Sequence, residues 1–65
     1  MSNINANTKH DFINNSLRLE ILSKLITESI TKDEIPKKQF MDDFEKFLNI
    51  ELNLLEDIKN QTLIN

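Results

Sequence analysis

The chain has 65 residues, with eight lysines and arginines, eleven aspartates and glutamates and one histidine, giving a formal net charge of −3 at pH 7. It contains no cysteine and no glycine, which excludes disulfide bonds and glycine-rich phosphate loops, and one histidine cannot by itself supply the ligands of a structural metal site. The negative charge disfavours nonspecific binding to nucleic acid or to an anionic membrane.

The N-terminal residues 1–7 carry one large apolar side chain, Ile4, among polar neighbours. Nothing there offsets the entropy lost on ordering the backbone, so we predict a disordered tail before a single domain over residues 8–62. Thr8, with Asp11 three positions later, resembles a capping box, and we expect the first helix over about residues 9–32. Ser16 is a second candidate start.

The first predicted helix has an apolar arc wider than half its circumference at 100° per residue. Such a width is more than one neighbouring helix can cover, which predicts at least two neighbours. The residues of this arc are Leu17, Leu19, Ile21, Leu22, Leu25, Ile26 and Ile30.

A turn is expected at about residues 33–36. Pro36 lacks a backbone N–H and disfavours helical angles at Ile35, so the second helix should begin close to it. Without glycine to adopt the common left-handed C-cap, we expect the first helix to end by another device. The alternative is one long kinked helix.

The second predicted helix, about residues 37–60, has core positions that alternate at three and four residues, the spacing of left-handed bundle packing. These positions are Met41, Phe44, Leu48, Glu51, Leu55 and Ile58, flanked by Phe40, Phe47, Ile50 and Leu54. The phenylalanines also have the spacing of a helix that anchors in a partner's groove, but the same face continues through the leucines, which favours core.

Two charged residues fall on apolar stripes: Arg18 on the first helix and Glu51 on the second. If the hairpin folds about residues 34 and 35, the two lie opposite one another, and we predict an ion pair, within a chain or across a dimer, that sets register. Alternatively, Arg18 extends to solvent and Glu51 lies at the edge of the stripe. No other acid, base or nucleophile converges on Glu51, so we expect no catalysis.

A basic cluster surrounds the turn and is the candidate nucleic-acid contact: Lys24, Lys32, Lys37 and Lys38. Nearby acidic residues weaken it, and a solvated loop is the favoured interpretation. His10 beside Asp11 offers too few ligands for a metal site. We therefore expect no metal and no cofactor.

These features predict an all-α protein, an antiparallel helical hairpin that dimerises into a four-helix bundle. Length and layout, though no residue motif, resemble the plasmid Rop family, which implies a dimer that binds RNA. Small helical secretion co-chaperones have a similar outline. We expect a small acidic protein-protein interaction module, a regulator, inhibitor or adaptor that binds itself or another protein, with a Rop-like nucleic-acid-binding dimer as the alternative. The N-terminus has no apolar leader and no apolar run is long enough to span a bilayer, so we expect a cytoplasmic location without membrane contact.

Overall fold

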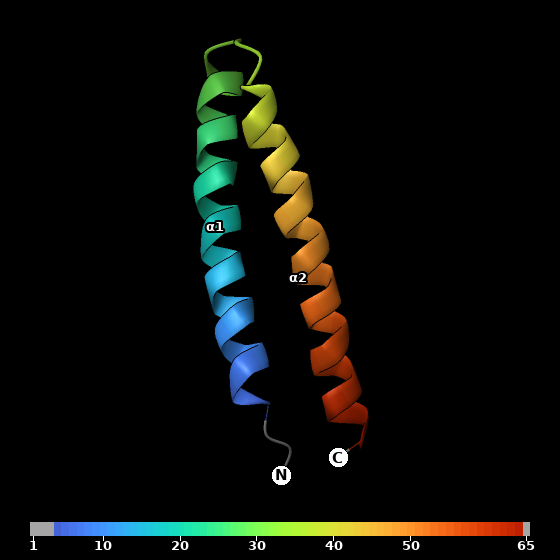
Figure 1. Cartoon of the computed structure of the whole chain (residues 1–65). Helices are drawn as coiled ribbons and strands as arrows, with labels where there is room; N and C mark the ends of the chain where they lie inside the picture. Colours follow the sequence, from blue (N-terminus) through green and yellow to red (C-terminus); the bar gives the residue numbers. More distant parts are fainter. Residues whose placement is uncertain (1–3, 65) are drawn as a thin grey trace.

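Two long α-helices joined by a short loop make up the protein. The computed structural model describes residues 4–64, with α1 at Ala6–Thr31 and α2 at Lys38–Ile64. The helices lie side by side and antiparallel, so that the start of α1 is near the end of α2 (Figure 1). The molecule measures 48 × 15 × 14 Å, a rod one helix pair thick. The predicted all-α hairpin is confirmed.

The first helix begins earlier than its sequence pattern indicated. Asn5 caps it, because the Asn5 Oδ1 accepts hydrogen bonds from the backbone N–H groups of Asn7 and Thr8, at 2.9 and 3.4 Å. The Gln61 side chain of α2 then accepts from the Asn5 N–H at 2.9 Å. The predicted start at Thr8 is therefore wrong, since Ala6 and Asn7 already belong to α1. Residues 1–3 of the predicted tail lie outside the described residues.

The C-terminus of α1 is closed by a left-handed residue even though the chain has no glycine. Asp33 has φ 57°, and its N–H donates to Ile30 O at 3.0 Å while the Glu34 N–H donates to Ser29 O at 2.8 Å. These two bonds define the Schellman motif, in which glycine usually occupies the position of Asp33. The expectation of a different device was wrong: the usual motif forms, with aspartate, one of the few residues that tolerate this conformation.

The second helix starts where the proline predicted. Lys37 O accepts hydrogen bonds from the N–H groups of Phe40 and Met41, at 3.0 and 3.3 Å, and α2 runs from Lys38. The helix continues past the predicted end at residue 60. Within the described residues, neither helix contains a stretch long and apolar enough to cross a membrane.

The helices meet along one stripe on each, and this contact stripe is where side chains are most covered. On α1 it comprises Phe12, Asn15, Leu19, Leu22, Ile26 and Ser29; on α2 it comprises Phe40, Phe44, Phe47, Glu51, Leu54, Ile58 and Gln61. Both sets alternate at three and four residues, as in left-handed helix packing. Only Leu22 and Asn15, 9% and 6% exposed, are buried among the described residues.

Several residues predicted for the core lie outside this stripe. Leu17, Ile21 and Ile30 are exposed, and Leu48 and Leu55 are more than a third exposed. They are not core in a single hairpin, because two helices cover only one narrow stripe of each other, and their place in an interface between chains stays a prediction. The other predicted core residues are at least partly covered: Leu22, Leu25, Ile26, Phe40, Met41, Phe44, Phe47, Leu54 and Ile58.

Replacing Asp33 by glycine should stabilise the hairpin. The left-handed conformation is unfavourable for a residue with a Cβ, and glycine removes that cost, so we expect Asp33→Gly to raise the free energy of unfolding by about 0.5–1 kcal/mol. Urea unfolding, monitored by the circular dichroism signal of the helices, measures this free energy. Glu34→Gly is the control and should lower stability; a stabilising Glu34→Gly with a neutral Asp33→Gly would contradict the assignment.

Candidate interaction surface

A polar layer crosses the middle of the contact stripe. The buried Asn15 Nδ2 donates to Phe47 O at 2.7 Å and to Glu51 Oε1 at 3.1 Å, and Ser16 Oγ donates to Glu51 Oε2. No buried side-chain nitrogen or oxygen among the described residues lacks a hydrogen-bond partner. A satisfied polar group at a core position fixes the register of paired helices, since any slip leaves it unpaired.

The predicted ion pair between Arg18 and Glu51 does not form within the chain. The two ion pairs of the described residues are local pairs four residues apart, Lys24–Glu20 at 3.7 Å and Lys38–Asp42 at 2.6 Å. Glu51 instead meets Asn15 and Ser16, two to three residues before Arg18. The symmetric turn assumed from residue numbers misplaced the register by that amount. A pair across two chains stays a prediction.

Arg18 lies over an aromatic ring instead. Its guanidinium carbon is 5.4 Å from the centre of the Phe47 ring, and Lys46 Nζ is 5.7 Å from the same ring. Cations at this distance are attracted to the ring face, although exposure keeps the contribution to about 0.5–1 kcal/mol. Phe47 therefore joins the helices through its ring and its carbonyl oxygen.

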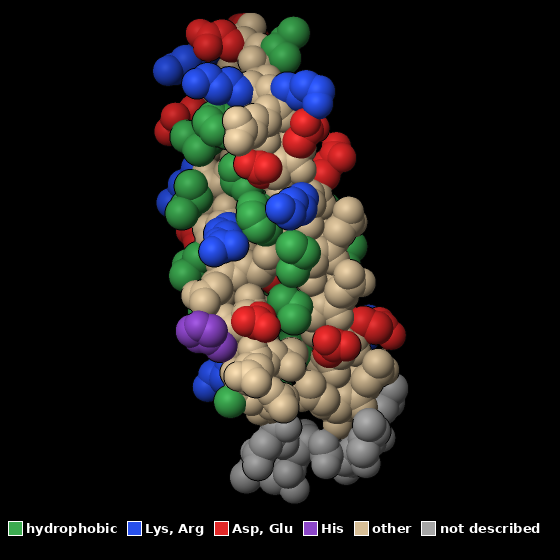
Figure 2. Space-filling view, in the orientation of Figure 1, with side chains coloured by type: hydrophobic (Ala, Val, Ile, Leu, Met, Phe, Trp, Pro, Cys, Tyr) green, Lys and Arg blue, Asp and Glu red, His purple; other side chains and the backbone are tan. Residues whose placement is uncertain are grey.

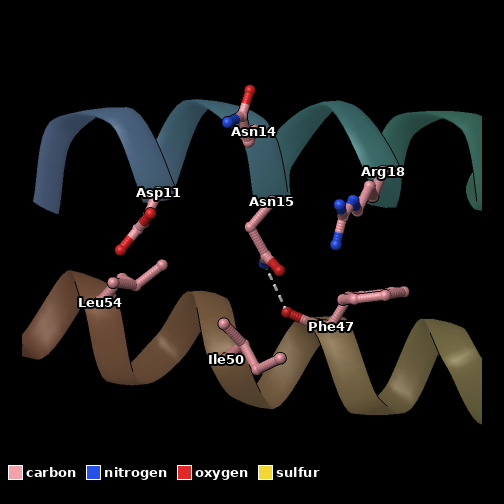
Figure 3. Close-up of a pocket in the computed structure, with 7 residues that line it drawn as sticks. All are labelled: Asp11, Asn14, Asn15, Arg18, Phe47, Ile50 and Leu54. Carbon is pink, nitrogen blue, oxygen red and sulfur yellow. Dashed lines mark hydrogen bonds between the residues drawn. The ribbon is translucent and has the colours of Figure 1, made fainter. Parts of the chain in front are cut away.

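A shallow groove runs along this side of the hairpin. It has a volume of about 280 Å³ and is lined by Asp11, Asn14, Asn15, Arg18, Phe47, Ile50 and Leu54. Asp11, Asn15 and Arg18 point from α1 toward α2, while Asn14 points away (Figure 3), and Asn14 Nδ2 is 2.9 Å from His10 Nε2. Within the described residues, no group of three or more histidines, cysteines, aspartates or glutamates could hold a metal ion.

Most of the basic residues around the loop already have local partners. Lys24 and Lys38 make the ion pairs above, and Lys37 Nζ lies 5.6 Å from the Phe40 ring centre. The hydrogen bond and the charge of Asp42 raise the pKa of Lys38 above its usual value. Lys32 is exposed at the end of α1. Their contact with nucleic acid stays a prediction, weakened by these neighbouring carboxylates and rings.

The two sides of the hairpin differ in character. Hydrophobic and charged side chains alternate along the groove face, which Figure 2 shows together with the histidine. On the opposite side, helical geometry at 100° per residue places Ile30 of α1, with Phe12, Leu19 and Ile26 at the edge of the contact stripe, on the same side as Met41, Leu48, Leu52 and Leu55 of α2. We call this set the apolar face. Sequence analysis did not separate it from the contact stripe because both have a three-four spacing.

Comparison with protein-family models, with curated proteins and with solved structures found no match for this chain.

Removing the buried amide should destabilise the hairpin only while its carboxylate partner is present. Asn15→Leu leaves Glu51 without that donor, and we expect a loss of about 1 kcal/mol, at the low end for a polar group because Glu51 is partly exposed. Glu51→Leu alone should keep or raise stability, because Asn15 still donates to Phe47 O. Urea unfolding of both single variants and the double variant at one protein concentration measures the coupling.

The double variant Asn15→Leu, Glu51→Leu should regain the stability lost by Asn15→Leu. If Asn15→Leu changes the free energy of unfolding by the same amount with Glu51 present and with Glu51 replaced, the polar layer does not couple the two helices.

Proposed function

We propose that this chain is a small non-catalytic protein-protein interaction module, a regulator, inhibitor or adaptor, acting as a helical hairpin or as a homodimeric four-helix bundle. The observation that carries the proposal is the small extent of burial: two residues of the described chain are buried, and ten large hydrophobic residues are exposed. A fold that hides so little apolar surface gains little from the hydrophobic effect on its own. Contact with another chain would supply the missing burial.

The exposed area supports this proposal quantitatively. A compact monomer of 7.7 kDa is expected to expose about 4,300 Å². The hairpin exposes 5335 Å², an excess of about 1,000 Å². A standard protein-protein interface buries about 800 Å² of each partner. The excess is therefore the size of one interface per chain.

No disulfide compensates for the thin core, because the chain has no cysteine. Small domains without disulfides or metals commonly obtain stability from a partner chain. In a four-helix bundle each helix has two neighbours, which matches the wide apolar arc of α1. The same surface would serve binding to another protein.

The proposal predicts that folding depends on concentration. We expect the molecular mass, measured by sedimentation, and the helicity, measured by circular dichroism, to fall together as the protein is diluted from micromolar to nanomolar concentration. The melting temperature should rise with protein concentration. A monomer that stays fully helical and melts cooperatively at nanomolar concentration would contradict the proposal, because its apolar surface would then need no partner.

A further inference from the structure

We infer that the apolar face is covered by a second copy of this chain, with α1 of each copy lying on α2 of the other. This rests on the proposed function and names both the surface and its occupant. Four observations support a second copy over an unrelated partner: the distribution of charge, the spacing of the residues, the alignment of the helices along the rod and the area.

The charged residues of the apolar face lie at its edges and ends. Along α1, this side from Phe12 to Ile30 carries apolar residues with Ser16 and Ser23 between them, and Thr27 and the charged Glu20 lie at its outer edge. Along α2, the charged positions on this side are Glu45 and Lys59, one toward each end, and Glu51 at the edge of the contact stripe, where it accepts a hydrogen bond from Ser16. The groove face carries Asp11, Arg18 and Lys46 instead. A charge-poor centre is typical of the buried part of a protein interface.

The apolar stripes of the two helices have the same spacing, so a stripe of one copy can run in step with the stripe of the other. Phe12, Leu19 and Ile26 recur at intervals of one heptad on α1, and Met41, Leu48 and Leu55 do so on α2. Between them, the small Ser16 and Ser23 on α1 correspond to the larger Glu45 and Leu52 on α2. Large side chains of one helix can therefore fit over small ones of the other.

The alignment of α1 with α2 along the length of the hairpin also agrees with a two-fold arrangement. Arg18 and Phe47 meet across the hairpin, close to the middle of α1. Leu19 and Leu48 are therefore at nearly the same level on the apolar face. A two-fold axis parallel to the helices leaves every residue at its own level, so it brings Leu19 of one copy opposite Leu48 of the other, with both helices overlapping along most of their length.

The exposed area of the hairpin agrees with one interface between two copies. The excess of about 1,000 Å² over a compact monomer is close to the roughly 800 Å² that each partner buries in a standard interface. One interface of standard size therefore accounts for the excess, and we assign that interface to the apolar face.

Two substitutions of equal exposure on the same helix test the assignment. Leu55 lies on the apolar face and Ile50 on the groove face, and each is 38% exposed. Leu55→Glu should weaken dimerisation by at least about a hundredfold, because it places an unpaired carboxylate in an apolar contact. Ile50→Glu should leave the dissociation constant within about threefold, a difference of about 0.65 kcal/mol. Sedimentation equilibrium measures both.

A second matched pair guards against a variant that fails to fold. Leu52 on the apolar face is 55% exposed and Leu17, on the outer side of α1, is 53% exposed. We expect Leu52→Lys to dissociate the dimer and Leu17→Lys to leave it intact. The inference is also supported if the apolar-face variants, and not the controls, lose both helix content and molecular mass, because the controls carry the same charge at the same exposure.

Two outcomes would overturn the inference while leaving the proposed function standing: a wild-type dimer that Leu55→Glu and Leu52→Lys leave intact, or one that Ile50→Glu dissociates instead. A wild-type chain that is monomeric and fully folded at every concentration would overturn both.

Discussion

The structure depends on how little of its own surface a pair of helices can cover. Each helix contacts the other along one stripe of alternating three and four residues, and the residues on either side of that stripe stay in contact with water. The consequence is visible in Leu17, Ile21 and Ile30, which are apolar yet exposed. The geometry of two cylinders, rather than a weak sequence pattern, leaves this surface open.

Local interactions determine the hairpin's ends, and a polar layer determines its register. The Asn5 cap with its link to Gln61 holds one end, and the Asp33 turn holds the other. Between them, Glu51 accepts hydrogen bonds from Asn15 and Ser16. Sliding one helix by a turn would leave a carboxylate and an amide without partners, which costs more than a shift of apolar contacts alone. The hairpin thus has one defined alignment despite its thin core.

The sequence was sufficient to predict two helices, their antiparallel pairing and the break at Pro36, because periodicity and proline are strong local signals. It was insufficient for the contact stripe. On α2, the neighbouring series Phe40–Phe47–Leu54 and Met41–Leu48–Leu55 have the same spacing, and only packing decides between them. On α1, Asn15 and Ser29 interrupt the stripe with polar residues, so Phe12 was overlooked. The partner of Glu51 depended on the exact geometry of the turn, which residue counting does not give.

The polar layer and the apolar face are physically connected through Ser16. This serine lies on the side of α1 that belongs to the apolar face, and it donates to Glu51 within the contact stripe. In the proposed dimer the second copy would exclude water from this hydrogen bond, and electrostatic interactions strengthen as the local dielectric constant falls. Association would then also stabilise the internal register of each hairpin, and a misaligned hairpin would present a face that no longer matches its copy. Register and partner choice would therefore be selected together.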